Sequence, residues 1–167
     1  MARLASGHDD IVTAFNENRN HQLFRWGKQI IDSKAVSRVS FINPSGVVLA
    51  RGHDELRFND PYRGPADLNR LRRGEDQTFL AQQNGGWFFV SAAPVFQYDV
   101  VFKGIVVVEK ALTPAFFDAM AKGFGLERIA LYFSENTPPP FGDKTKGFLS
   151  AAAVCSLENK NGNRAFT

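Results

Sequence analysis

The stretch VSFINPSGVVLARGHD, residues 39–54, decides the fold. Two apolar runs flank a Pro-Ser-Gly group at 44–46, a combination typical of a tight turn. We therefore predict a hairpin of two strands, 37–43 and 47–51. The second strand ends in an Arg-Gly-His-Asp cluster. This ending has two interpretations: a ligand-contacting corner of a sheet, or an ordinary solvated strand end.

Working outward from this hairpin, the apolar periodicity predicts the remaining elements. Apolar residues recur near a 3.6-residue period between 9 and 31, which predicts one long amphipathic helix there. The other expected elements are a loop at 52–64, a short helix at 65–73, strands at 78–82, 87–96 and 100–112, a helix from 114 to 123 or 125, and a last strand at 126–133.

This order of elements predicts an α+β fold. Strands joined by hairpins form antiparallel sheet, and the helices are segregated from them. We expect a five- or six-stranded antiparallel sheet with the long N-terminal helix packed on one face. Residues 1–133 form this domain. The proline-rich segment that follows makes 134–167 a linker and a C-terminal extension, or the start of a second module.

Composition excludes several classes of function. The 167 residues carry a net charge of only +3 and one cysteine, without the Cys/His spacing of zinc or haem sites, so we expect no metal, cofactor or nucleic acid. The arginines near residues 70–73 are expected to form a solvated helix face. Ser91 and His53 are the only nucleophile and base that the topology could bring together, and no catalytic motif accompanies them, so we expect no enzymatic activity.

Several motifs together resemble a known family. The hairpin with its following FND, the strand GGWFFVSAAPVF and the strand FKGIVVVEKAL resemble the extracytoplasmic CACHE sensor domains of bacterial chemoreceptors and sensor kinases. The similarity covers residues 10–133 and implies a PAS-like sheet behind a long N-terminal helix. Two positions depart from the pattern: Asn43 replaces an Asp of the turn, and Asn59 stands where Gly is usual.

The resemblance implies a ligand on the sheet, under the loop and short helix that follow the second strand. The candidate ligand-binding residues at those places are Arg51, His53, Tyr62, Arg63, Trp87, Phe89 and Ser91. Residues 87, 89 and 91 share one face of their strand, and we favour this set for the pocket. The alternative for these aromatic residues is ordinary core packing.

The expected ligand is a small organic acid, an amino acid or an aromatic compound. Val90 stands where carboxylate-binding relatives have a second basic residue, which disfavours a di- or tricarboxylate. By resemblance, the chain is the periplasmic portion of an inner-membrane receptor with its output domain elsewhere. The resemblance also allows a homodimer and the membrane-distal module of a double-CACHE sensor. The alternative is a PAS-like protein-interaction or structural module without a small ligand.

Overall fold

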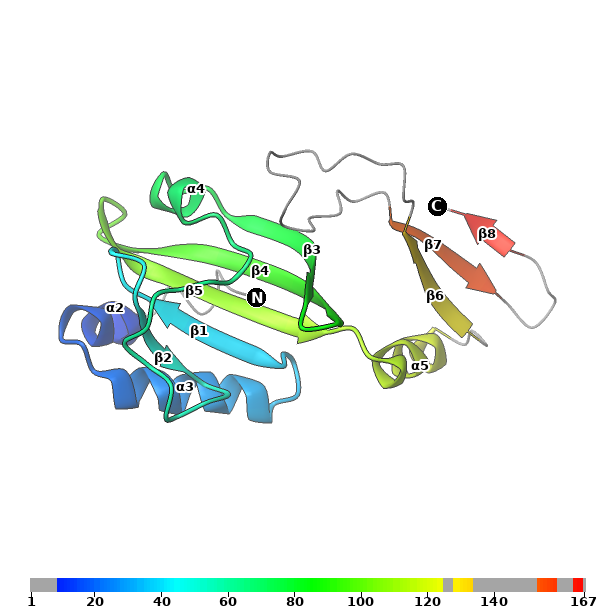
Figure 1. Ribbon diagram of the computed structural model, residues 1–167, viewed down its shortest axis with the longest axis horizontal. Coiled ribbons are helices and arrows are strands. Elements are labelled where there is room, and N and C mark those ends of the chain that lie inside the picture. Colours follow the sequence, from blue (N-terminus) through cyan, green and yellow to red (C-terminus); the bar gives the residue numbers. More distant parts are fainter. Residues whose placement is uncertain (1–8, 125–127, 134–152, 159–163, 167) are drawn as a thin grey trace. The chain divides into compact units, whose positions relative to one another are not determined.

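The computed structural model describes residues 9–124, 128–133, 153–158 and 164–166. Its elements are α2 (Asp9–Asn16), α3 (Asn20–Asp32), β1 (Arg38–Ile42), β2 (Val48–Arg51), α4 (Leu68–Arg72), β3 (Gln77–Gln83), β4 (Gly86–Gln97), β5 (Val101–Ala111), α5 (Pro114–Gly123), β6 (Arg128–Phe133), β7 (Ala153–Glu158) and β8 (Arg164–Phe166) (Figure 1).

The central feature is a five-stranded sheet with strand order β2-β1-β5-β4-β3. β1 pairs antiparallel with both β2 and β5. The predicted hairpin and the α+β class are confirmed. The alternative of a sixth strand in this sheet is wrong, because β6 pairs with β7 in a separate three-stranded sheet, β6-β7-β8.

The chain divides into two compact units. The first comprises residues 1–78 and 90–110, and the second comprises residues 79–89 and 111–167. In the second unit α5 begins at a Thr113 cap, whose side chain accepts a hydrogen bond from the Phe116 amide, and it packs against β6. The predicted boundary at residue 133 stays a prediction, and most of the proline-rich linker lies outside the described residues.

The single N-terminal helix expected at 9–31 is wrong, because two helices occupy this segment. α2 ends at Asn16, Asn18 adopts a left-handed conformation with φ of 50°, and α3 begins at Asn20. Asparagine tolerates this conformation better than most residues, so the chain turns here without a glycine. Neither helix, nor any other helix in the described ranges, has the length and apolar character needed to cross a membrane.

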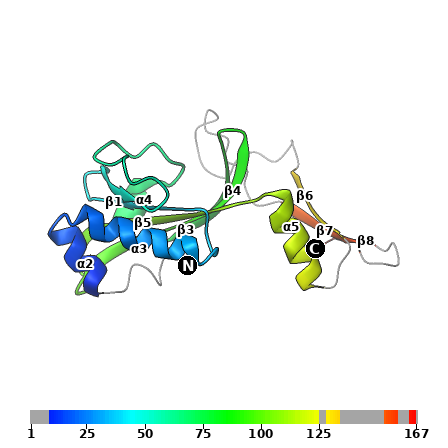
Figure 2. The same ribbon diagram turned by 90° about the horizontal axis from the view of Figure 1, so that it is seen from below.

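Both faces of the sheet in the first unit are covered. Helices α2 and α3 lie on one face, and the loop 52–64 with α4 lies on the other (Figure 2). The helix-side core contains Ile11, Ala14, Phe15, Leu23, Val36, Val39, Phe41, Leu49, Ala50, Ala93, Val95, Val106 and Val108. Intervening positions supply buried residues to the opposite, loop-side face: Ile42, Val48, Val90, Ala92, Ile105 and Val107.

Helix α3 approaches the end of β2 with no side chain in between. A Cβ on Gly27 would lie 2.8 Å from the Cα of Gly52 and 3.1 Å from the Phe41 ring. A Cβ on Gly52 would lie 2.7 Å from the Gly27 carbonyl oxygen. Both glycines are buried, and the Gly52 amide donates to the Val39 carbonyl at 2.9 Å. The glycine between Arg51 and His53 is therefore needed for helix packing.

The second half of the loop 52–64 is hydrogen-bonded to β2 and to the turn before it. The Asn59 amide donates to the Val48 carbonyl at 2.7 Å, and the Val48 amide donates to the Asp60 carbonyl at 2.9 Å. The Tyr62 amide then donates to the Gly46 carbonyl at 2.9 Å. Residues 59–62 thus run along the outer side of β2, and this pairing fixes the position of the loop's second half.

Replacing Gly27 by Ala tests the helix contact. Helix propensity alone would stabilise this change by about 1 kcal/mol. We expect the reverse, a decrease of about 1–3 kcal/mol in the free energy of unfolding, because the new methyl group meets the backbone of Gly52. Gly123→Ala is the matched control, since no heavy atom lies within 4 Å of its Cβ position. Denaturant unfolding measures both, and equal behaviour of the two variants would contradict the contact.

Candidate functional site

Arg51 anchors the loop that follows β2. Its Nη1 donates to an Asp60 carboxylate oxygen at 2.6 Å, and its Nη2 donates to the other oxygen at 2.8 Å. Nη1 also donates to the Arg57 carbonyl at 2.8 Å. The Arg51 side chain is only 11% exposed. Hydrogen bonds from Arg51 lower the pKa of the Asp60 carboxyl. The guanidinium is therefore occupied by the protein's own loop.

A second ion pair crosses β1 and β5 on the loop-side face. Arg38 and Glu109 are register partners, and their charged groups lie 3.4 Å apart. The Glu109 side chain is 10% exposed. A carboxylate this buried needs a cation or strong hydrogen bonds, because its desolvation is costly. Arg38 provides the cation.

His53 is close enough to both ion pairs to be affected by the charges of Arg38 and Arg51. Burial and the positive charges of Arg38 and Arg51 lower the pKa of its imidazole, although a hydrogen bond with the Val39 backbone and the Asp54 charge oppose that shift. The folded protein thus favours the neutral ring, which has one donor and one acceptor nitrogen.

Tyr62 completes this group of polar side chains. Burial raises the pKa of its hydroxyl, with the Glu109 charge contributing in the same direction and Arg51 opposing it. The hydroxyl accepts a hydrogen bond from the Ala66 amide at 3.4 Å. We call Arg38, Arg51, His53, Tyr62 and Glu109 the polar cluster.

The polar cluster includes three of the seven predicted site residues: Arg51, His53 and Tyr62. Arg63 is exposed on the loop. Ser91 alternates with Ala93 and Val95, which belong to the helix-side core, so it lies on the face opposite the polar cluster. The prediction that residues 87, 89 and 91 line the pocket is therefore wrong for Ser91.

Trp87 and Phe89 belong to the second unit. Phe89 is 45% exposed, and the Trp87 carbonyl accepts a hydrogen bond from the Leu112 amide. A convergence of these rings with Arg51 stays a prediction.

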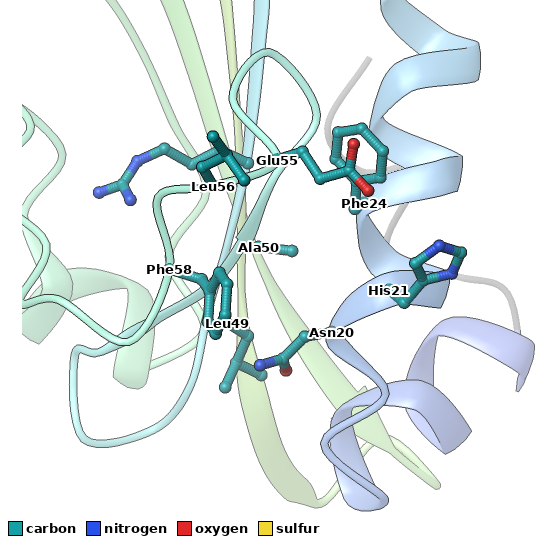
Figure 3. A pocket seen from close by; sticks show the side chains of 9 residues that line it. Asn20, His21, Phe24, Leu49, Ala50, Glu55, Leu56 and Phe58 are labelled. Carbon is teal, nitrogen blue, oxygen red and sulfur yellow. The ribbon is translucent and has the colours of Figure 1, made fainter.

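The first unit also contains a groove between α3, β2 and the first half of the loop. Its volume is about 360 Å³, and its lining comprises Asn20, His21, Phe24, Leu49, Ala50, Arg51, Glu55, Leu56 and Phe58 (Figure 3). Of the seven predicted site residues, Arg51 alone is part of this lining. The groove opens beside the helix, and its floor is formed by Leu49 and Ala50.

Sequence reasoning missed Arg38, Asp60 and Glu109. One signal could have indicated Glu109, since a single acidic residue follows the apolar run Ile105 to Val108 and requires a partner if the strand is buried. The pairing of Arg51 with Asp60 has no comparable signal, because it depends on the path of the loop. No group of three or more His, Cys, Asp or Glu that could hold a metal occurs in the part of the chain described.

Comparison with solved structures identifies the fold. The sensor domain of E. coli DcuS matches with a TM-score of 0.58 and 12% identity, over 66% of this chain and 83% of that domain. The chain has the fold of a bacterial sensor domain. The sensor domain of the V. cholerae histidine kinase DctB matches with a TM-score of 0.52 and 15% identity, over 77% of this chain and 51% of that one. No protein-family model and no curated protein matches.

These matches confirm the PAS-like fold predicted from the CACHE resemblance. Both relatives are sensor domains, and one is named as part of a histidine kinase. In this chain, the sensor-domain fold has a covered sheet, with the polar cluster on the loop-side face and two N-terminal helices on the other face.

Asp60→Asn tests the anchoring of the loop. The change removes the negative charge of the carboxylate and leaves the Arg51 guanidinium without its anionic partner. We therefore expect the free energy of unfolding to fall by about 2 kcal/mol at pH 7. Arg57→Gln is the control, with an expected effect within about 0.5 kcal/mol, because Arg57 is 68% exposed and lies 3.7 Å from Asp60. The folded pKa of Asp60 is depressed, so its contribution is present above the unfolded value of 3.8 and is lost as pH falls through the lower folded value.

The lowered pKa of His53 predicts a second pH effect. As pH falls through 6.5, the unfolded chain takes up the His53 proton before the folded protein does. The free energy of unfolding should therefore decrease between pH 6.5 and the lower folded pKa. Denaturant titrations of the parent and of His53→Asn over this range measure the effect. The variant should show a shallower decrease, and an unchanged slope would contradict the assigned shift.

Proposed function

We propose that the chain is the extracytoplasmic ligand-sensing domain of a membrane-bound signal-transduction receptor, either a sensor histidine kinase or a chemoreceptor. The observation that carries the proposal is the polar cluster, built on the loop-side face of a sensor-domain fold. Binding, without covalent chemistry, is the role of this domain. The output activity belongs to another part of the receptor.

The ligand contacts His53 and Tyr62 between the loop and the sheet, beside Arg38 and Arg51. Each guanidinium already has a carboxylate partner, Arg38 with Glu109 and Arg51 with Asp60. His53 favours its neutral form, so the polar cluster together with Asp60 has two arginines, two carboxylates and no net charge. This balance favours a ligand without net charge, such as a zwitterionic amino acid or an uncharged aromatic compound. A dianion would lack a free cation.

The bound state reaches the N-terminal helices through Gly52. His53 follows Gly52 in the chain, and Gly52 contacts Gly27 of α3 backbone to backbone. A ligand that draws His53 toward the sheet therefore displaces the point on which α3 rests. Only a difference in ligand affinity between two helix positions can shift their populations. In the receptor, α2 and α3 carry this shift toward the membrane from the periplasmic side.

A thermal-shift screen with amino acids, mono- and dicarboxylates and aromatic compounds tests the proposal. One class of uncharged or zwitterionic ligand should stabilise the protein, by about 2.7 kcal/mol at a concentration 100 times its Kd. His53→Gln and Tyr62→Phe should reduce the stabilisation. Arg63→Gln is the control, because Arg63 is exposed on the same loop.

Arg51 variants are unsuitable for this test because they release the loop. If no compound stabilises the protein, or if the stabilisation is unchanged in both cluster variants, the proposed site is wrong. A PAS-like interaction module, which binds a protein and no small ligand, would then be the better description.

A further inference from the structure

The groove beside α3 presents apolar side chains to solvent. Leu56 is 91% exposed and Phe58 is 49% exposed, although both line a concave surface whose floor is almost completely buried. Phe24 forms part of the opposite wall (Figure 3). Exposed apolar groups that surround a groove of about 360 Å³ are typical of a small-ligand site.

One buried polar atom of the groove lining has no hydrogen-bond partner in the described part of the chain. The side-chain oxygen of Asn20 is buried and lacks a hydrogen-bond partner within the described residues. Such an oxygen costs about 1–3 kcal/mol unless a donor reaches it. In Figure 3 the amide nitrogen of Asn20 is on the side of Leu49, and the oxygen is on the other side of the amide. A half-turn of the amide would exchange the two atoms and bring the oxygen toward the groove.

The charges of the lining favour a cation. Arg51 lines the groove, but its guanidinium is held by Asp60 and the Arg57 carbonyl. Glu55 extends from the loop toward α3 (Figure 3), and it forms no ion pair with any residue in the described ranges. A carboxylate beside the aromatic walls of Phe24 and Phe58 suits an ammonium group, which binds carboxylates and aromatic faces alike.

We propose that this groove is a second ligand site, which binds a small amine with an aromatic or branched apolar body. The body covers Leu49, Leu56 and Phe58, and the ammonium group lies between Glu55 and the Asn20 oxygen. This site is on the helix side of β2, whereas the polar cluster is on the loop side. Arg51 belongs to both, because it lines the groove and is part of the polar cluster.

Two phenylalkyl probes of similar size but opposite charge test the proposal. Titrations of the ¹⁵N-labelled protein with 2-phenylethylamine and with 3-phenylpropanoate follow the backbone amides of the groove residues. The amine should cause saturable shifts at Ala50, Glu55 and Leu56, with a Kd on the order of millimolar for so small a molecule. The carboxylate should bind at least about threefold more weakly, because Glu55 repels it.

Variants of exposed residues keep the test separate from folding. Glu55→Gln should weaken amine binding about three- to fivefold, and Leu56→Ser should weaken it further by removing apolar contact. Glu17→Gln removes the same charge from the turn between α2 and α3 and should leave binding unchanged. His53→Gln should also leave it unchanged, which separates this site from the polar cluster.

Several outcomes would overturn the inference. They are the absence of saturable shifts, equal affinities for the two probes, and insensitivity to Glu55→Gln. A fourth is a change in the chemical shifts of the groove amides when the free protein is diluted, because this would show that a second copy of the chain covers the groove. Failure of the amine test leaves the sensing proposal intact, since that proposal depends on His53 and Tyr62.

Discussion

The backbone contact between Gly27 and Gly52 is the constraint on which the first unit depends. It allows α3 to lie directly on the end of β2, and the side chains of the residues before and after Gly52 both belong to the polar cluster. Arg51 reaches Asp60 in the loop, while His53 lies near Arg38 and the Val39 backbone. Helix, edge strand and loop therefore meet at one residue. A side chain at either glycine would separate all three.

The second general feature is that the buried charges occur in pairs. Glu109 continues a fully buried apolar run in β5, and it is tolerated there because Arg38 is its register partner on β1. Asp60 plays the same role for Arg51. This pairing offsets part of the desolvation cost of the charged groups beside a covered sheet. It also leaves neutral donors and acceptors, from His53 and Tyr62, as the groups available for recognition.

Much of this fold could be predicted from local patterns. The prediction of the turn at residues 44–46 is correct because the residues that form a turn are neighbours in the sequence. Asn43 stands where the family pattern has Asp, and its side-chain oxygen still accepts a hydrogen bond from the Val47 amide at 2.9 Å. Thr113 and Pro114 likewise mark the start of α5. The break near Asn18 was missed because the apolar period continues across it.

The site was predictable only in part, for a different reason. Arg51, His53 and Tyr62 come from one stretch of chain, and the structure brings them together. Ser91 required a choice between two faces of β4, and both faces of that strand contain buried residues, so alternation alone could not decide. The partners Arg38 and Glu109 are 71 residues apart. Only the register between β1 and β5 brings them into contact.

The pairing of residues 59–62 along β2 has a consequence for solubility. β2 is the edge of the sheet, and an open edge of unpaired amides and carbonyls invites strand addition from another molecule. Here the chain's own continuation occupies that edge, and Pro61 lies opposite Val47 without an amide hydrogen to offer. The segment that holds Asp60 and Tyr62 thus also protects this border of the sheet from intermolecular aggregation.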